Sequence, residues 1–260
     1  MGKHLLATIA LLAWSTANAA ESLKNNLVHA RDIPAVTSAT GALVRTFTFP
    51  TGTIREIRLP KGSKATYAIS AETEIFLLHG AAKLDTTDLN PGDAVNRPHG
   101  TLINATAGED TVVVGWTVGS SVKDSKGMVF RMTDTKPEPV ANWVEDGKEV
   151  YARGEEQLRG RTPTEGASRW ISRRYQFDGN SIRWANFQKG GVTVWATPTG
   201  DNLIYIAKGR FRRVEGPEVD EVAEGDVVRE AAGLRGRWEP LEESAFLSST
   251  AQPPSGAARP

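Results

Sequence analysis

Short runs of apolar and β-branched residues, separated by turns, extend along the chain from Leu43 onward. Glycine and proline divide each run from the next, a pattern that is typical of β-strands joined by tight turns. Regular short strands of this kind predict an all-β sandwich or barrel. The runs in the first part of the chain are Val44–Phe49, Ile54–Leu59, Ala65–Ile69, Glu74–Leu78 and Thr111–Val118.

The strand pattern lapses in the middle of the chain and then resumes. Residues 123–166 are rich in charge, and within them Ala141–Leu158 is expected to hold a short helix or two. Ser249–Pro260 contains three prolines and no large apolar residue, so we expect a disordered tail there. The strands expected in the second part are Arg173–Phe177, Ser181–Phe187, Val192–Thr197, Asn202–Ala207, Arg210–Val214, Asp226–Arg229, Gly236–Glu239 and Ala245–Ser248.

The two strand-rich parts share a spacing of glycine turns. Gly92 and Gly100 in the first part are as far apart as Gly225 and Gly233 in the second, and each pair follows a strand that itself ends in glycine. A shared spacing indicates an internal repeat. The sequence therefore predicts an N-terminal barrel over 30–120, a linker over 121–166, a C-terminal barrel over 167–249 and a tail over 250–260.

The first residues have the features of a secretory signal peptide. Lys3 and His4 precede the apolar run Leu5–Trp14, and Ala17-Asn18-Ala19 provides the small residues of a cleavage site. The run is shorter than the roughly 20 apolar residues that cross a bilayer, although an N-terminal membrane anchor is the alternative interpretation. We expect residues 1–19 to be removed, and the mature protein to be periplasmic or secreted and not stably inserted in a membrane.

Composition narrows the class of protein further. The 260 residues are 39% hydrophobic, which favours a globular chain over a disordered one. The 31 basic and 31 acidic residues cancel, which argues against nucleic acid as a partner. There is no cysteine, so an exported form must depend on core packing for its stability and not on disulfides.

Three segments of the first half resemble the signature of the cupin superfamily. They are Phe76–Gly80, which ends a strand in glycine, Leu89–Asp93, which contains a Pro-Gly-Asp turn, and Arg97–Gly100. In the second half, Gly233–Glu239 resembles the last strands of one cupin subgroup. The resemblance implies a bicupin, in which two antiparallel β-barrels of the jelly-roll kind follow one another in tandem.

The resemblance does not extend to the metal ligands of the family. Cupin enzymes usually hold a divalent metal with two histidines spaced His-x-His, a glutamate and a third histidine. The His-x-His strand corresponds to Thr66–Ser70, which has no histidine, the glutamate to Thr73 or, with a slip of one residue, Glu74, and the third histidine to Ile103. We therefore expect no metal and no cofactor. In the second half these positions are occupied by Trp195, Asn202 and Gly236.

Four side chains are candidate acids or bases for a reaction that needs no metal. Glu74 is a candidate if it points into a barrel, because burial would raise the pKa of its carboxyl group. His79 and His99 lie at strand ends or turns, and Tyr205 lies in a predicted strand. The alternative for Glu74 is an exposed edge residue, and for the histidines it is a place in solvent-exposed turns.

Candidate ligand-binding residues gather in the second barrel. If Asn202 marks its inward face, the period of two also directs Trp238 inward, and the motif alignment does the same for Trp195. Aromatic walls with one amide suit a small organic or sugar ring, although packing of the tryptophans in the core is an equal alternative. Fourteen of the 20 arginines follow Val150, and Arg183, in the strand Ser181–Phe187, is the first candidate to hold an anion.

These features favour one function and leave two alternatives open. The first hypothesis is an exported, metal-free bicupin that binds a small, anionic or carbohydrate-derived ligand in its C-terminal barrel. The second is a metal-independent lyase or isomerase acting on a sugar acid or a similar carboxylate. The third is a structural subunit of a homodimer.

Overall fold

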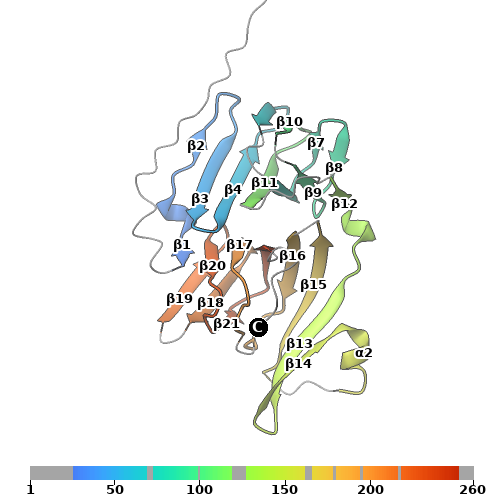
Figure 1. The fold of residues 1–260 in the computed structure, drawn as a ribbon, viewed down its shortest axis with the longest axis vertical. Helices are drawn as coiled ribbons and strands as arrows, with labels where there is room; N and C mark the ends of the chain where they lie inside the picture. The colour runs from blue at the N-terminus through green and yellow to red at the C-terminus, as the bar shows by residue number, and fades with distance from the viewer. Residues whose placement is uncertain are drawn as a thin grey trace, which may run out of the picture.

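The computed structural model describes residues 26–68, 73–98, 100–118, 127–161, 166–177, 180–193, 196–215 and 218–251. Most of these residues lie in strands, and the all-β prediction is confirmed. The strands form two halves, one above the other in Figure 1. Among the described strands no sheet closes on itself, and each half consists of a large and a small sheet. No helix in the described ranges is long and apolar enough to cross a membrane.

The N-terminal half contains a seven-stranded and a four-stranded sheet. The large sheet has the order β12-β9-β6-β11-β4-β3-β2 and the small one β5-β10-β7-β8, with antiparallel pairing throughout. The strands of this half are β2 (Val36–Thr37), β3 (Leu43–Phe49), β4 (Gly52–Leu59), β5 (Lys64–Ala68), β6 (Thr73–His79), β7 (Ala82–Leu84), β8 (Thr87–Leu89), β9 (Ala94–Arg97), β10 (Leu102–Ala107), β11 (Thr111–Val118) and β12 (Val129–Phe130).

The C-terminal half contains an eight-stranded and a three-stranded sheet. The large sheet has the order β1-β20-β17-β22-β16-β15-β13-β14 and the small one β19-β18-β21. The strands of this half are β1 (Leu27–Val28), β13 (Glu138–Glu145), β14 (Lys148–Arg153), β15 (Ser168–Gln176), β16 (Asn180–Phe187), β17 (Asn202–Lys208), β18 (Arg210–Glu215), β19 (Glu218–Ala223), β20 (Val227–Glu230), β21 (Gly236–Pro240) and β22 (Ser244–Ala251).

Each half has its own core between its two sheets, and the two cores differ in composition. The N-terminal core consists of aliphatic side chains, including Ile103 and Ala105. The C-terminal core is rich in aromatic rings, with Phe187 and Phe211 at its centre. The N-terminal interior is therefore filled with side chains.

A third core joins the two halves, because the central strands of both large sheets are buried on both faces. In β6, Ile75 and Leu77 pack inside the N-terminal half, whereas Phe76 packs against the other half. In β17, Ile204 lies inside the C-terminal half and Tyr205 faces the N-terminal half. Because both faces of β6 and β17 are covered, the candidate acids and bases on these strands, Glu74 and Tyr205, are buried.

The halves exchange short segments at their edges. Strand β1 comes first in the described chain, yet it pairs with β20 of the C-terminal half, and Figure 1 shows it in blue beside the orange β20. Strand β12, which precedes the C-terminal half in sequence, pairs with β9 of the N-terminal half. Each exchanged strand leads into a 3-10 helix, η2 (Ala30–Asp32) or η3 (Met132–Asp134).

The backbone conformation supports the repeat that glycine spacing predicts. Gly92 and Gly225 have φ angles of 91° and 90°, and Gly100 and Gly233 both have φ of 81°. A side chain is strained in this left-handed region, which explains why glycine recurs at these turns.

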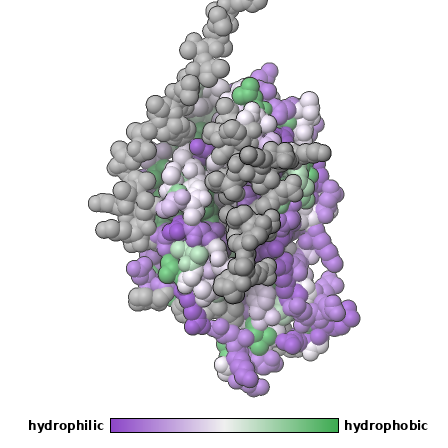
Figure 2. Space-filling model, in the orientation of Figure 1, coloured by the Kyte–Doolittle hydropathy of each residue, from purple (hydrophilic) through white to green (hydrophobic). Residues whose placement is uncertain are grey.

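Several predicted elements differ from those observed. The stretch expected to contain one or two helices holds most of the hairpin β13–β14 and only one short helix, α2 (Gly154–Leu158). Residues 192 and 196 form isolated bridges, so the described part of Val192–Thr197 is no regular strand. Strand β22 extends to Ala251, two residues beyond the point where the tail was expected to begin. The surface around the β13–β14 hairpin is mainly hydrophilic in Figure 2, in keeping with the charged residues that misled the helix prediction.

Candidate functional site

Strand register places a set of polar side chains on the inner face of the large C-terminal sheet. Arg183 of β16 pairs with Arg174 of β15 on one side and with Ser248 of β22 on the other. In the next row, Asn202 of β17 pairs with Glu230 of β20. Side chains of directly paired residues share a face, so these five residues lie on one face at one end of this half, with Arg174 exposed there.

Arg183 is half-buried on this face and close to other arginines. Burial, followed by the positive charges of Arg174 and Arg153, lowers the pKa of its guanidinium group, while the carboxylate of Glu230 acts in the opposite direction. Within the described residues, the side chains of Arg174 and Arg183 make no hydrogen bond or ion pair. Like charges directly opposite each other on neighbouring strands are destabilising. The Arg174–Arg183 pair therefore provides a concentration of positive charge that an anion would neutralise.

A second cluster, centred on Glu230, lies on the same face. The carboxylate accepts hydrogen bonds from Trp238 Nε1 at 2.8 Å and from Asn202 Nδ2 at 3.0 Å, and it forms an ion pair with Arg213 at 2.9 Å. Arg213 and Trp238 are almost completely buried. We call Glu230, Arg213, Trp238 and Asn202 the Glu230 cluster.

The structure brings three of the four candidate ligand-binding residues to this face but changes the role of Trp238. Its ring packs against Phe211 and Phe246 with centroid separations of 5.5 Å, and the guanidinium of Arg213 lies 4.9 Å from its centroid. The ring is thus part of the core and is not an open aromatic wall. Trp195, the other expected aromatic residue, lies outside the described residues.

The residues at the family's metal positions do not suit a divalent metal. Gly236, at the position of the third histidine, lies so close to the Arg213 guanidinium that a Cβ there would overlap it. Ile103, the corresponding residue of the N-terminal half, is packed among aliphatic side chains. Among the residues that the structure describes, no three histidine, aspartate or glutamate side chains gather where they can hold a metal ion.

Glu74 points neither into its own half nor toward solvent at an exposed edge. It is completely buried between the halves, where its Oε2 accepts a hydrogen bond of 2.6 Å from Ser249 Oγ. Both expected positions are wrong, because the other half covers the face of β6 that carries Glu74. A role as acid or base is not supported by this location.

Tyr205 also lies between the halves. Its hydroxyl donates a hydrogen bond of 2.8 Å to Oε2 of the buried Glu56. Burial and the negative charge of Glu56 raise the pKa of the phenol well above its ordinary value. Arg45 and Arg58 pair with the other oxygen of Glu56, which makes this a closed network across the contact.

The two candidate histidines are not brought together with these groups. His79 is exposed at the end of β6, and His99 lies outside the described residues. None of the described acid or base candidates therefore lies on the arginine-bearing face. Their catalytic roles stay predictions.

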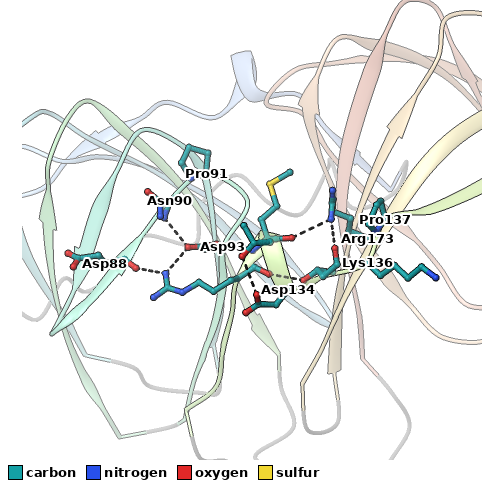
Figure 3. Close-up of a pocket in the computed structure, with 12 residues that line it drawn as sticks. Asp88, Asn90, Pro91, Asp93, Asp134, Lys136, Pro137 and Arg173 are labelled. Carbon is teal, nitrogen blue, oxygen red and sulfur yellow. Dashed lines mark hydrogen bonds and ion pairs between the residues drawn. The ribbon is translucent and has the colours of Figure 1, made fainter.

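A cavity of about 650 Å³ lies where the N-terminal half meets the segment that leads into the C-terminal half. Figure 3 shows Asp93 on one side and Arg173 on the other, with Asp134 between them. Asp93 pairs with Arg131 at 2.8 Å, and Arg173 donates to the backbone carbonyl groups of Met132 and Thr135. The groups that line this cavity mainly hold the connection between the halves in place.

The architecture places the chain in the class of all-β proteins with the cupin fold. Solved structures with this fold match the chain at low sequence identity. AerE from Microcystis aeruginosa is 7% identical with a TM-score of 0.63, covering 85% of this chain and 97% of its own. YlbA from E. coli, of the DUF861 family, is 11% identical with a TM-score of 0.60, covering 86% and 89%.

An oxalate decarboxylase mutant from Bacillus subtilis is 13% identical with a TM-score of 0.61, covering 87% of this chain and 77% of its own. No family model matches the sequence, and no curated protein matches it. At these identities the similarities establish the fold alone.

Sequence reasoning missed two members of the site. Ser248 was expected only as the end of a strand, and Glu230 was not considered. Glu230 follows Val228, a core residue, by two positions, so the period of two was a signal that it faces inward. Arg174 and Arg213 stood among the C-terminal arginines, but their closeness to Arg183 and Trp238 depends on strand pairing that the sequence does not specify.

Proposed function

We propose that the chain is an exported, metal-free bicupin that binds a small anionic or carbohydrate-derived ligand on the inner face of its C-terminal half. The observation that carries the proposal is the Arg174–Arg183 pair, in which two guanidinium groups lie on directly paired strand positions and form no ion pair with a described residue. Arginine presents a planar fork of donors that matches a carboxylate. The half-buried location of Arg183 strengthens this attraction by reducing solvent screening.

The bicupin assignment draws support from reciprocal contacts between the halves. Trp116 Nε1 donates to the carbonyl of Leu203 at 3.3 Å, and Ser249 donates to Glu74. Trp116 pairs with Glu74 in one sheet, just as Ser249 pairs with Leu203 in the other. In each case a residue of one half donates to the strand of the other half that corresponds to its own neighbouring strand. This reciprocal arrangement is expected for two copies of one unit.

Binding is measured by the rise in melting temperature of the purified protein with a panel of small carboxylates, sugars and phosphates. We expect carboxylates to stabilise the wild type and Arg183→Ala to abolish that stabilisation. Arg169→Ala is the matched control, because Arg169 is exposed on the opposite face of β15. Unchanged stabilisation of Arg183→Ala would overturn the proposed site.

Export and assembly are tested by one further experiment. We propose cleavage after Ala19 and a periplasmic or secreted mature chain, so mass spectrometry of the protein from an exporting host is expected to show Ala20 as its first residue. A native spectrum of the same sample reports whether the protein forms a homodimer, as the third hypothesis requires. An uncleaved chain retained in the membrane fraction would contradict the export proposal.

A further inference from the structure

The composition of the inner face narrows the ligand to one chemical class. The polar side chains do not stop at the arginines but continue across four adjacent strands, β16, β22, β17 and β20, through Ser248 and Asn202 to Glu230. Deeper in the same half, the next row of paired positions is apolar, with Ala185, Phe246 and Ile206. A ligand on this face therefore meets positive charge at one end and a series of neutral and acidic hydrogen-bonding groups at the other.

The buried Ser248 has a hydroxyl group with unused hydrogen-bonding capacity. It is directly paired with Arg183, and its side chain makes no hydrogen bond within the described residues. A serine hydroxyl both donates and accepts hydrogen bonds, so it suits an alcohol better than it suits a hydrocarbon chain. Directly paired side chains lie within about 5.5 Å at Cβ, which places this hydroxyl beside the arginine fork.

Glu230 has remaining capacity to accept a hydrogen bond. Two donors, Trp238 and Arg213, bind its Oε1, whereas only Asn202 binds its Oε2. A carboxylate has about four lone-pair sites, so Oε2 can accept one more donor. A second carboxylate group of a ligand would be repelled at this end, but a hydroxyl group would donate to it.

We propose that the ligand is a hydroxylated organic acid, whose carboxylate binds Arg174 and Arg183 and whose hydroxyl groups bind Ser248 and Glu230. This inference rests on the proposed function, because it assumes that the arginine-bearing face is the ligand site. It adds that the site recognises the hydroxyl groups as well as the charge.

Three six-carbon probes separate the two recognition elements. Gluconate has both a carboxylate and hydroxyl groups, hexanoate has only the carboxylate, and sorbitol has only hydroxyl groups. By calorimetric titration we expect gluconate to bind at least tenfold more tightly than either of the others. Arg183→Ala is expected to weaken gluconate binding by tenfold or more.

Ser248→Ala tests the hydroxyl contact without disturbing an ion pair. We expect it to weaken gluconate severalfold and to leave the affinity for hexanoate unchanged. Ser249→Ala, on the other face of the same strand, is the control and is expected to lower stability through the lost contact with Glu74 without changing affinity for gluconate. Glu230→Gln, which keeps the shape of the side chain, is expected to change the preference between gluconate and hexanoate.

The outcomes distinguish the inference from the function on which it rests. Equal binding of hexanoate and gluconate, lost in Arg183→Ala, would overturn the hydroxylated-acid inference and leave the anion site intact. Equal binding of sorbitol and gluconate, unaffected by Arg183→Ala, would overturn the anion site. Absence of binding by both acids would overturn both.

Discussion

Asp93 and Asp226 occupy equivalent positions in the two halves, and each carboxylate holds an exchanged segment in place. Oδ1 of Asp93 accepts a hydrogen bond of 2.9 Å from the backbone N–H of Met132, at the start of η3. Oδ1 of Asp226 accepts one of 2.8 Å from the backbone N–H of Ala30, at the start of η2. Both carboxylates are nearly completely buried.

The second oxygen of each aspartate completes the equivalence. Oδ2 of Asp93 accepts from the backbone N–H three residues earlier at 3.0 Å, and Oδ2 of Asp226 does the same at 2.9 Å. A basic side chain immediately before each 3-10 helix also reaches Oδ2, from Arg131 at 2.8 Å and from His29 Nδ1 at 2.9 Å. The aspartate that follows each glycine turn residue thus binds the exchanged segment that packs against its half. Asp93 binds the β12–η3 segment, and Asp226 binds the β1–η2 segment.

Replacing either aspartate by alanine is expected to destabilise the protein by similar amounts. Each substitution removes several hydrogen bonds to a buried carboxylate and leaves two backbone N–H groups without their acceptor, a loss on the order of 3 kcal/mol. Chemical denaturation of Asp93→Ala and Asp226→Ala measures the effect. Asp32→Ala, at an exposed position, is the control with an expected change within about 0.5 kcal/mol. Losses near the control value would show that the turns do not depend on these carboxylates.

Arg174→Glu is expected to raise stability and abolish anion binding. The substitution replaces repulsion with attraction opposite Arg183, which is worth about 0.2–1 kcal/mol for a cross-strand pair. The same charge change at the control position, Arg169→Glu, lies on the other face of β15 and should leave ligand affinity unchanged. Denaturation and calorimetry of the two variants test both effects. Retained carboxylate affinity in Arg174→Glu would rule out this residue as part of the site.

Gly236→Ala is expected to disrupt the Glu230 cluster. An added Cβ would overlap the guanidinium of Arg213, which would have to move away from Glu230. Forcing side chains from a packed position costs about 1–3 kcal/mol. Gly115→Ala is the matched control in another strand, since the nearest atom to its new Cβ would be 3.7 Å away. Equal stability of the two variants would contradict the close packing of Arg213 on Gly236.

Tyr175 is expected to make stability fall steeply in alkaline solution. Burial raises the pKa of its phenol from 10.0 to about 12. The unfolded chain therefore loses this proton first, so the stabilising contribution is complete below pH 10 and is lost as the pH rises toward 12. At about 1.4 kcal/mol per pH unit the total is about 3 kcal/mol.

Tyr175→Phe is the variant that checks this contribution. It removes the titrating group together with the hydrogen bond of 2.7 Å to the carbonyl of Gly92. We expect lower stability at neutral pH but a shallower decline between pH 10 and 12, measured by denaturation at several pH values. An identical decline in the variant and the wild type would show that this phenol does not titrate in that range.

The sequence predicted the strands of both halves better than it predicted their faces. Glycine turns such as Gly92 and Gly225 are detectable because only glycine adopts their backbone conformation readily. Which core Glu74 would point toward was not predictable from the sequence. Both faces of β6 are apolar, so the alternation of polar and apolar residues does not show which face each side chain lies on. Asn202 was chosen because the motif alignment places it at the family's glutamate position, and Arg183 because it lies in a predicted strand of the arginine-rich second part.

Other parts of the fold depend on contacts between residues far apart in the chain. The pairing of β1 with β20 and of β12 with β9 leaves no local pattern, since two-residue strands have no periodicity. The β13–β14 hairpin was mistaken for helix because its exposed faces carry charged residues, which suit the outside of a helix equally well. Strand register, which places Ser248 beside Arg183, requires the tertiary structure.

The exchanged segments also impose an order on folding during protein synthesis. The ion pair between Arg131 and Asp93 spans 38 residues, whereas the contact between His29 and Asp226 spans 197. A nascent chain leaving the ribosome can therefore complete the N-terminal half once η3 has emerged. The segment around His29 must wait until nearly the whole chain has been translated, so its docking on β20 is expected to be a late step that commits both halves to one native structure.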